Sequence, residues 1–85
     1  MMQLRQGDLT WQLAGEEVVV LDLAGSTYLK LNGSGRVLWE RLAQASTEPE
    51  LVACLMEAYD IEEARATADV AEFLADLRSR GLVTE

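Results

Sequence analysis

The chain of 85 residues has no histidine, one cysteine and one proline. Without histidine it lacks the side chain that most often serves as a general base near neutral pH and as a metal ligand. Cys54 cannot form an internal disulfide, and its apolar neighbours predict a helix near the core, where a free thiol behaves as a small hydrophobic group. We therefore expect no catalytic residue, no metal site and no cofactor.

Positive charge is also scarce, since 7 Lys and Arg residues stand against 15 Asp and Glu, for a formal net charge of −8. Proteins that bind nucleic acids or anionic membranes usually concentrate Lys and Arg, because phosphate neutralisation supplies most of their nonspecific affinity. The charge of this chain has the opposite sign. It argues against nucleic-acid and membrane partners and favours a partner with basic residues.

Long apolar segments are missing as well. No apolar run approaches the roughly 20 residues that span a bilayer, and residues 1–8 contain no apolar signal segment, so we predict a cytoplasmic protein. With 49% hydrophobic and 26% charged residues, the composition is that of a folded chain. The length predicts a single domain over residues 1–85 with one modest core.

Three short segments predict the strands of an antiparallel meander. Residues 10–14 alternate weakly, and the unbroken valine run within 17–22 is typical of a central strand that is paired on both sides. In residues 27–31 the odd positions share one face, and Tyr28 and Lys30 lie on the other. The third segment is then an edge strand, where a charged residue discourages indiscriminate pairing.

Helical periodicity follows these strands. A first helix is expected over residues 34–45, with Trp39 in the core, while Trp11 either packs over the sheet or serves a partner surface. A second helix starts at a capping box formed by Thr47 and Glu50 and continues to residue 59.

The third helix is expected to start around residues 60–63, after a short break whose position the pattern does not fix. It ends before Gly81, where Leu82 is expected to close a Schellman-type contact. Strands and helices occupy separate halves of the chain, which predicts an α+β fold with a three-stranded antiparallel sheet followed by three helices. Because so small a sheet is not stable alone, the helices must cover one of its faces.

Several segments, in this order and spacing over about residues 18–83, resemble one protein family. They include Val20-Leu-Asp-Leu23, Tyr28-Leu-Lys-Leu-Asn32, Val37-Leu-Trp39, Thr47-x-x-Glu-Leu51, Phe73-Leu-x-x-Leu77 and Gly81-Leu82. The chain is similar to the pyrroloquinoline quinone synthesis protein D family, also called the RiPP recognition element, and most similar to the stand-alone recognition proteins of lasso-peptide biosynthesis. One departure is Ser26, since relatives often carry the turn glycine immediately before the strand.

This resemblance implies a fold like a winged helix-turn-helix and a binding function without catalysis. Members of the family bind the leader segment of a ribosomally made precursor peptide as a fourth strand beside the third strand, in a groove against the third helix. In lasso-peptide pathways the bound leader is presented to a leader peptidase and then to an ATP-dependent macrolactam cyclase. The implied peptide-binding residues are Tyr28, Leu29, Lys30 and Leu31 on the strand, and Asp69, Val70, Phe73, Asp76 and Leu77 on the helix.

The residues by themselves leave alternatives open. The apolar stripe of the third helix, which includes Val70, Phe73 and Leu77, also fits plain core packing. Tyr28 lies opposite the face of Leu29 and Leu31, so it is expected to be half-exposed and able to contact a ligand. Pairing rules alone do not distinguish the edge at 27–31 from the edge at 10–14.

Three other functions remain to be weighed against peptide binding. A winged-helix DNA-binding regulator needs basic and amide side chains on its recognition helix, whereas residues 62–80 carry five acids and three arginines. An enzyme is also disfavoured, because Glu62 and Glu63 are adjacent and point in different directions on a helix. A generic dimerisation module would use the same free strand edge.

Overall fold

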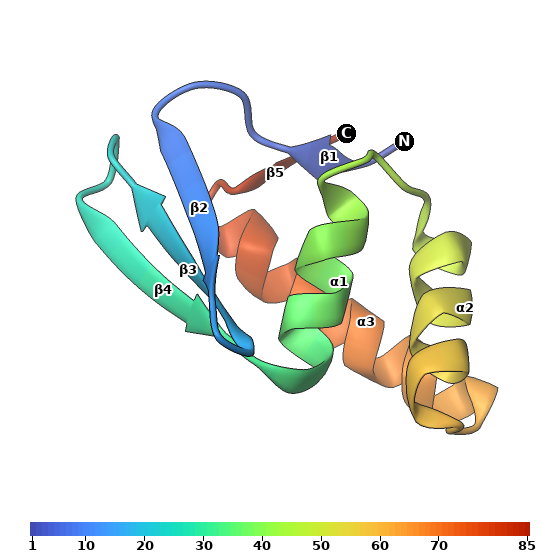
Figure 1. Cartoon of the computed structure of the whole chain (residues 1–85). Helices are drawn as coiled ribbons and strands as arrows, with labels where there is room; N and C mark the ends of the chain where they lie inside the picture. Colours follow the sequence, from blue (N-terminus) through green and yellow to red (C-terminus); the bar gives the residue numbers. More distant parts are fainter.

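The main sheet of the computed structural model, which describes every residue from Met1 to Glu85, is a meander. It contains strands β2 (Leu9–Ala14), β3 (Glu17–Asp22) and β4 (Thr27–Leu31), all antiparallel and in the order β2-β3-β4. The prediction of an enclosed second strand and an edge third strand is confirmed. Figure 1 shows β4 at one end of the molecule, with no further strand beside it.

Three helices follow the sheet and lie on one side of it (Figure 1). They are α1 (Gly33–Leu42), α2 (Glu48–Tyr59) and α3 (Glu63–Ser79). The fully or almost fully buried side chains of the helices and of β3 form one core, consisting of Val18, Val20, Leu38, Trp39, Leu42, Leu51, Leu55, Ala66, Val70, Leu74 and Leu77. The α+β class with a three-stranded sheet and three helices is confirmed.

Two tryptophans join the sheet to this core. Trp39 is fully buried, as predicted. Trp11 of β2 packs edge-on against it, with ring centroids 6.2 Å apart and ring planes at 83°. Aromatic pairs favour this geometry because the positive ring edge meets the negative ring face. The half-buried Trp11 therefore packs on the core.

The helix ends follow the capping signals of the sequence. The Thr47 hydroxyl accepts a hydrogen bond from the Glu50 backbone N–H at 3.3 Å, and the Glu50 carboxylate accepts one from the Thr47 N–H at 2.8 Å. The predicted capping box of α2 is thus confirmed, and the hydrogen bonds from Thr47 hold the pKa of the Glu50 carboxyl below its usual value. The break between α2 and α3, whose position the sequence does not fix, falls at Asp60, which adopts the left-handed conformation with φ 51°.

The end of α3 is a Schellman motif, as predicted. The Leu82 N–H donates to the Leu77 carbonyl at 3.0 Å, and the Gly81 N–H donates to the Arg78 carbonyl at 3.1 Å. Gly81 has a φ of 70°, which a residue without a Cβ adopts at no steric cost.

Two features of the fold differ from the prediction. Helix α1 ends at Leu42 rather than at residue 45, because the chain turns there and Ser46 exchanges two 2.8 Å backbone hydrogen bonds with Met2. The termini also form a second, two-stranded antiparallel sheet from β1 (Gln3–Leu4) and β5 (Val83–Thr84). Strands of two residues carry no periodicity, so the sequence pattern does not reveal them.

The turn before β4 contains a non-glycine residue in the left-handed conformation. Ser26 has a φ of 53°, a left-handed conformation that glycine adopts freely and that costs other residues roughly 1–2 kcal/mol. At the preceding position, a Cβ added to Gly25 would lie 3.0 Å from the Asp22 carboxylate. Glycine is therefore needed sterically at 25 and would relieve strain at 26.

We predict opposite effects of two substitutions in this turn. Ser26→Gly should raise the free energy of unfolding by up to about 1 kcal/mol, because relief of strain exceeds the extra flexibility of the unfolded chain. Gly25→Ala should lower it, because the new methyl group displaces the Asp22 carboxylate. Urea denaturation of both variants measures the difference. Equal effects of the two changes would contradict the assigned turn geometry.

Candidate functional site

The alternation of hydrogen bonds in the sheet determines which backbone groups of β4 are unpaired. Antiparallel pairs alternate between those that exchange backbone hydrogen bonds and those that do not. The Leu23 N–H donates to the Asp8 carbonyl at 2.8 Å, and this pair continues the β2–β3 register one step beyond Leu9 and Asp22. The odd-numbered residues of β3 therefore bond to β2, and its even-numbered residues bond to β4.

The same alternation separates the β4 residues that bond to β3 from those that face away from the sheet. Its partners in the register are Val18 with Leu31, Val20 with Leu29, and Asp22 with Thr27. These three β4 residues direct their N–H and C=O groups toward β3. Tyr28 and Lys30 consequently direct theirs away from the sheet, where no strand pairs with them. The open edge offers two N–H donors and two C=O acceptors, on residues that are two positions apart.

The side chains of β4 alternate as predicted. Leu29 and Leu31 are half-buried and pack against the core beneath the sheet. Lys30 and Tyr28 lie on the opposite face, and Tyr28 is 56% exposed beside its cross-strand neighbour Leu21. The outer face of the edge is thus open, and its inner face is apolar.

The C-terminal half of α3 comes near the inner side of this edge at two places. Phe73 is half-buried and lies near the first turn of α1, since a Cβ on Gly35 would lie 3.8 Å from the Phe73 ring and 3.4 Å from the side chain of Leu31 at the end of β4. Near the other end of β4, Thr27 and Leu29 share a hollow with Arg80. The strand and helix therefore run in opposite directions, with Phe73 near Leu31 and Arg80 near Thr27.

Two hollows lie beside this arrangement, the larger between α1 and α3 and the smaller between β4 and the C-terminal end of α3. The larger, of about 560 Å³, is lined by Ser34, Gly35, Leu38, Asp69, Glu72, Phe73 and Asp76. The smaller, of about 170 Å³, is lined by Val20, Asp22, Gly25, Thr27, Leu29, Arg80 and Leu82. Each combines an apolar surface with charged groups at its rim, which suits the side chains of an extended peptide.

The charge of the larger hollow is negative. Asp69 pairs with Arg65 at 3.9 Å and Asp76 pairs with Arg80 at 3.2 Å, both one helical turn away, whereas Glu72 forms no ion pair. All six arginines of the chain are in ion pairs, and Lys30 is the one basic side chain that is not. The acidic rim therefore has no free cation nearby on α3.

The structure separates the predicted helix residues into two groups. Phe73 and Asp69 are half-buried and Asp76 is exposed, so all three present surface beside the edge. Val70 and Leu77 are fully buried and belong to the core, so neither has surface that a docked peptide could touch. Their part in any binding would be to support Phe73 from below.

The lining residues that sequence reasoning missed include Ser34, Gly35, Glu72 and Arg80. Glu72 could have been found, because positions 69, 72 and 76 share one helix face and all three are acidic. Gly35 carries no such signal. Its closeness to Phe73 depends on tertiary packing, which periodicity does not encode.

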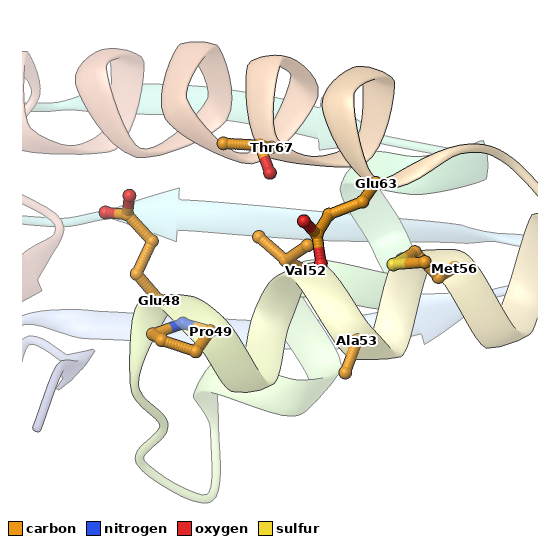
Figure 2. A pocket seen from close by; sticks show the side chains of 7 residues that line it. All are labelled: Glu48, Pro49, Val52, Ala53, Met56, Glu63 and Thr67. Atoms are coloured by element: carbon orange, nitrogen blue, oxygen red, sulfur yellow. The ribbon is translucent and has the colours of Figure 1, made fainter.

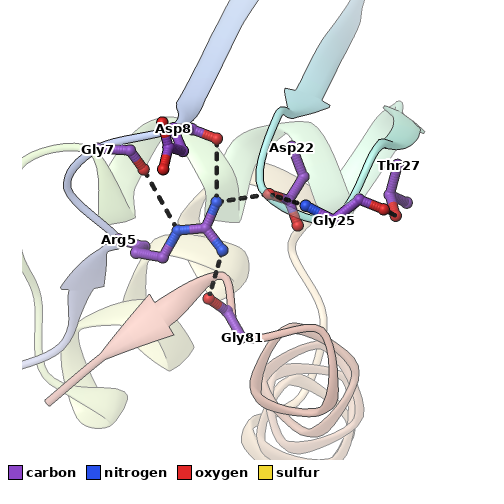
Figure 3. Close-up of polar contacts among 7 residues, drawn as sticks. All are labelled: Arg5, Gly7, Asp8, Asp22, Gly25, Thr27 and Gly81. Atoms are coloured by element: carbon purple, nitrogen blue, oxygen red, sulfur yellow. Dashed lines mark hydrogen bonds and ion pairs between the residues drawn. The ribbon is translucent and has the colours of Figure 1, made fainter.

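A polar clamp fixes the sheet at the smaller hollow (Figure 3). The Arg5 guanidinium pairs with the Asp22 carboxylate and donates to the carbonyls of Gly7, Asp8 and Gly81 at 3.4, 3.1 and 3.2 Å. The hydrogen bond from Arg5 holds the pKa of the Asp22 carboxyl below its usual value, although partial burial opposes it. The charged clamp thus ties the N-terminal segment, the end of β3 and the end of α3 together.

Two other kinds of feature, a metal-binding cluster and a membrane-spanning helix, are absent from the fold. No group of three or more Cys, Asp or Glu side chains lies where it could hold a metal ion. Helices of the length and apolarity that a membrane crossing requires do not occur in the fold.

Comparison with solved structures finds two chains with the same fold. The structure described as TbiB1 in complex with the TbiA(beta) leader peptide has a TM-score of 0.88 and 23% identity, over 95% of this chain and 93% of that chain. The structure described as lasso peptide synthetase B1 complexed with the leader peptide has a TM-score of 0.84 and 21% identity, over 99% and 98%. No curated protein matches in sequence.

The sequence itself matches a known family over most of its length. Residues 17–83 match the family described as coenzyme PQQ synthesis protein D, PqqD. The matched range starts with β3 and includes β4, all three helices and the Schellman motif at Gly81. The resemblance found in the sequence is thus confirmed, and the chain belongs to the PqqD family, which includes the RiPP recognition elements.

Proposed function

We propose that this chain binds the leader segment of a ribosomally synthesised precursor peptide by β-strand addition. The observation that carries the proposal is the open edge at Tyr28 and Lys30, with one hollow beside Thr27, Leu29 and Arg80 and a second between α1 and α3 at Phe73. These two hollows are the groove beside the edge. An extended peptide gains affinity from backbone hydrogen bonds at such an edge and specificity from pockets for alternate side chains. Membership of the PqqD family and the leader complexes of the two similar structures support it.

The hydrogen-bond alternation of the sheet determines which β4 residues would bond to the leader. Two leader residues, two positions apart, would exchange hydrogen bonds with Tyr28 and Lys30, and the side chains would alternate between the two faces. Leader side chains on the inner face would meet Leu29, Leu31 and Phe73. An apolar residue is favoured there, because burial of its surface adds to the backbone hydrogen bonds.

The charge of the groove further restricts the leader. Beyond Phe73 the rim carries Asp69, Glu72 and Asp76, so Lys or Arg in the leader would be attracted to this end. The same acids repel phosphate. The acidic α3 thus disfavours the DNA-binding alternative on the very helix that a winged-helix regulator would use for recognition.

We further propose that the bound leader is presented to a leader peptidase and then to an ATP-dependent macrolactam cyclase of a lasso-peptide pathway. In this proposal the whole chain, residues 1–85, is one recognition domain that contributes binding and no catalytic group. An added strand remains accessible on its outer face, beside the exposed Tyr28. A processing enzyme could therefore approach the leader while it stays bound.

The assignment of the edge predicts different outcomes for proline at neighbouring positions. Lys30→Pro should leave the fold intact and weaken leader binding at least tenfold, since its N–H faces away from the sheet and proline is tolerated at such edges. Leu29→Pro should lower stability by about 3 kcal/mol or more, because the N–H that it removes bonds to β3. Calorimetric titration with leader peptide and circular dichroism measure the two effects.

Lys30→Ala is the control for the lost charge, and it should bind leader almost normally. Normal leader binding by a folded Lys30→Pro protein would contradict strand addition at β4. If instead Lys30→Pro unfolds and Leu29→Pro keeps the fold, then the N–H of Lys30 bonds to β3 and that of Leu29 faces outward, the reverse of the assignment above.

Truncation of the helix side separates groove residues from core residues. Phe73→Ala should weaken leader binding by about 1–3 kcal/mol, because a half-buried ring next to the edge is a candidate hot spot. Leu77→Ala should instead lower stability by about 2–5 kcal/mol, because its fully buried side chain leaves a cavity. Thermal melting and leader titration on both variants test this, and unchanged affinity of folded Phe73→Ala would exclude the groove as the site.

A further inference from the structure

Helix α2 carries a second apolar stripe at the margin of the core. Its buried side chains are Leu51 and Leu55. A separate set follows the helical spacing i, i+3, i+4 and i+7 and lies half-buried or exposed toward the outside: Pro49, Val52, Ala53 and Met56. Val52 and Met56 pack against the margin of the core, but the stripe keeps apolar surface on an open hollow, which core packing alone does not explain.

This second stripe is one wall of a groove between α2 and α3 (Figure 2). The hollow has a volume of about 330 Å³, and α3 contributes Glu63 and Thr67 to its opposite wall. Glu48 and Glu63 extend from the two helices toward the groove, one near each end of the apolar stripe (Figure 2). Figure 1 shows α2 at the opposite end of the molecule from β4, so this groove is remote from the peptide edge.

The two carboxylates of the groove carry uncompensated charge. Neither Glu48 nor Glu63 appears in any ion pair of the structure, although six other acids are paired. An acid in a first helical turn also stabilises its own helix, so charge alone would mark no site. Here the acids flank an apolar stripe, and together they complement a segment with apolar and basic residues.

We propose that the α2–α3 groove, defined by Pro49, Val52, Ala53, Met56 and the flanking acids Glu48 and Glu63, binds a basic amphipathic helix of a partner protein. Such a helix seats apolar side chains on the stripe and directs Lys or Arg toward the acids. Because the groove and the β4 edge are far apart, the partner binds while the leader is held. In this respect the inference rests on the proposed function, and the partner is a protein that acts on the bound leader.

Charge distinguishes this occupant from the other candidates. Nucleic acids and anionic lipids are repelled by the two carboxylates and by the net charge of −8. A second copy of this chain carries the same negative charge, and each of its arginines is already in an ion pair. A basic segment of a different protein has neither disadvantage.

A designed peptide tests the groove without knowledge of the natural partner. The probe is a helix of about 18 residues, long enough to fold alone, with leucines at i, i+3, i+4 and i+7 and flanking lysines. A second peptide has glutamate in place of every lysine. In NMR titrations of the full chain, the lysine peptide should shift the amides of residues 50–56 and 67, and the glutamate peptide should not.

Three variants control the specificity of this binding. The double variant Glu48→Gln/Glu63→Gln should weaken the lysine peptide by about three- to tenfold, and Val52→Asp should abolish its binding. Arg36→Gln, which alters a surface ion pair on α1, should have no effect. Circular dichroism confirms that each variant is folded.

Leader affinity separates this inference from the proposed function. Leader peptide should bind all three variants normally and should bind in the presence of the lysine peptide. Shifts at β4 instead of α2, equal binding of both probes, insensitivity to the double variant, or concentration-dependent shifts at the groove without any peptide would each overturn the groove proposal. Failure of the leader to bind the unaltered chain would overturn the proposed function instead and leave the groove result intact.

Discussion

The backbone pairing of β3 on both sides is the constraint on which the rest of the structure depends. The odd-numbered residues of β3 form backbone hydrogen bonds with β2, and its even-numbered residues form them with β4. The N–H and C=O groups of β4 that face outward are therefore those of Tyr28 and Lys30. The same alternation puts Leu29 and Leu31 against the core and leaves Tyr28 on the open face. A shift of one residue would reverse both assignments at once.

The helices and the terminal segments hold this edge in place. Helix α3 approaches it at Phe73, which packs against the core cluster that contains the buried Val70 and Leu77. The Schellman motif at Gly81 turns the chain back toward the N-terminal segment, where Arg5 clamps it to Asp22 at the end of β3. Residues that are far apart in sequence thus fix the two walls of the groove relative to each other.

Local rules predict much of this fold and a smaller part of the site. The capping box at Thr47 and the glycine at 81 are short-range signals whose hydrogen bonds form within a few residues, so the sequence reveals them. The Arg5–Asp22 clamp joins segments that only the folded chain brings together. Periodicity places Val70, Phe73 and Leu77 on one apolar face, but it does not tell which of them the sheet covers. How deeply each side chain is buried depends on tertiary packing. Phe73 is only partly buried and keeps surface for the groove, whereas Val70 and Leu77 are fully buried in the core.

Amide hydrogen exchange tests the central claim most directly, because it observes the individual N–H groups of the sheet. In the free chain the amides of Thr27, Leu29 and Leu31 should be protected, and those of Tyr28 and Lys30 should exchange rapidly. Saturation with leader peptide should protect Tyr28 and Lys30 and leave the others unchanged. New protection at the outward amides of β2, or continued rapid exchange at Tyr28 and Lys30 in the bound state, would contradict strand addition at β4.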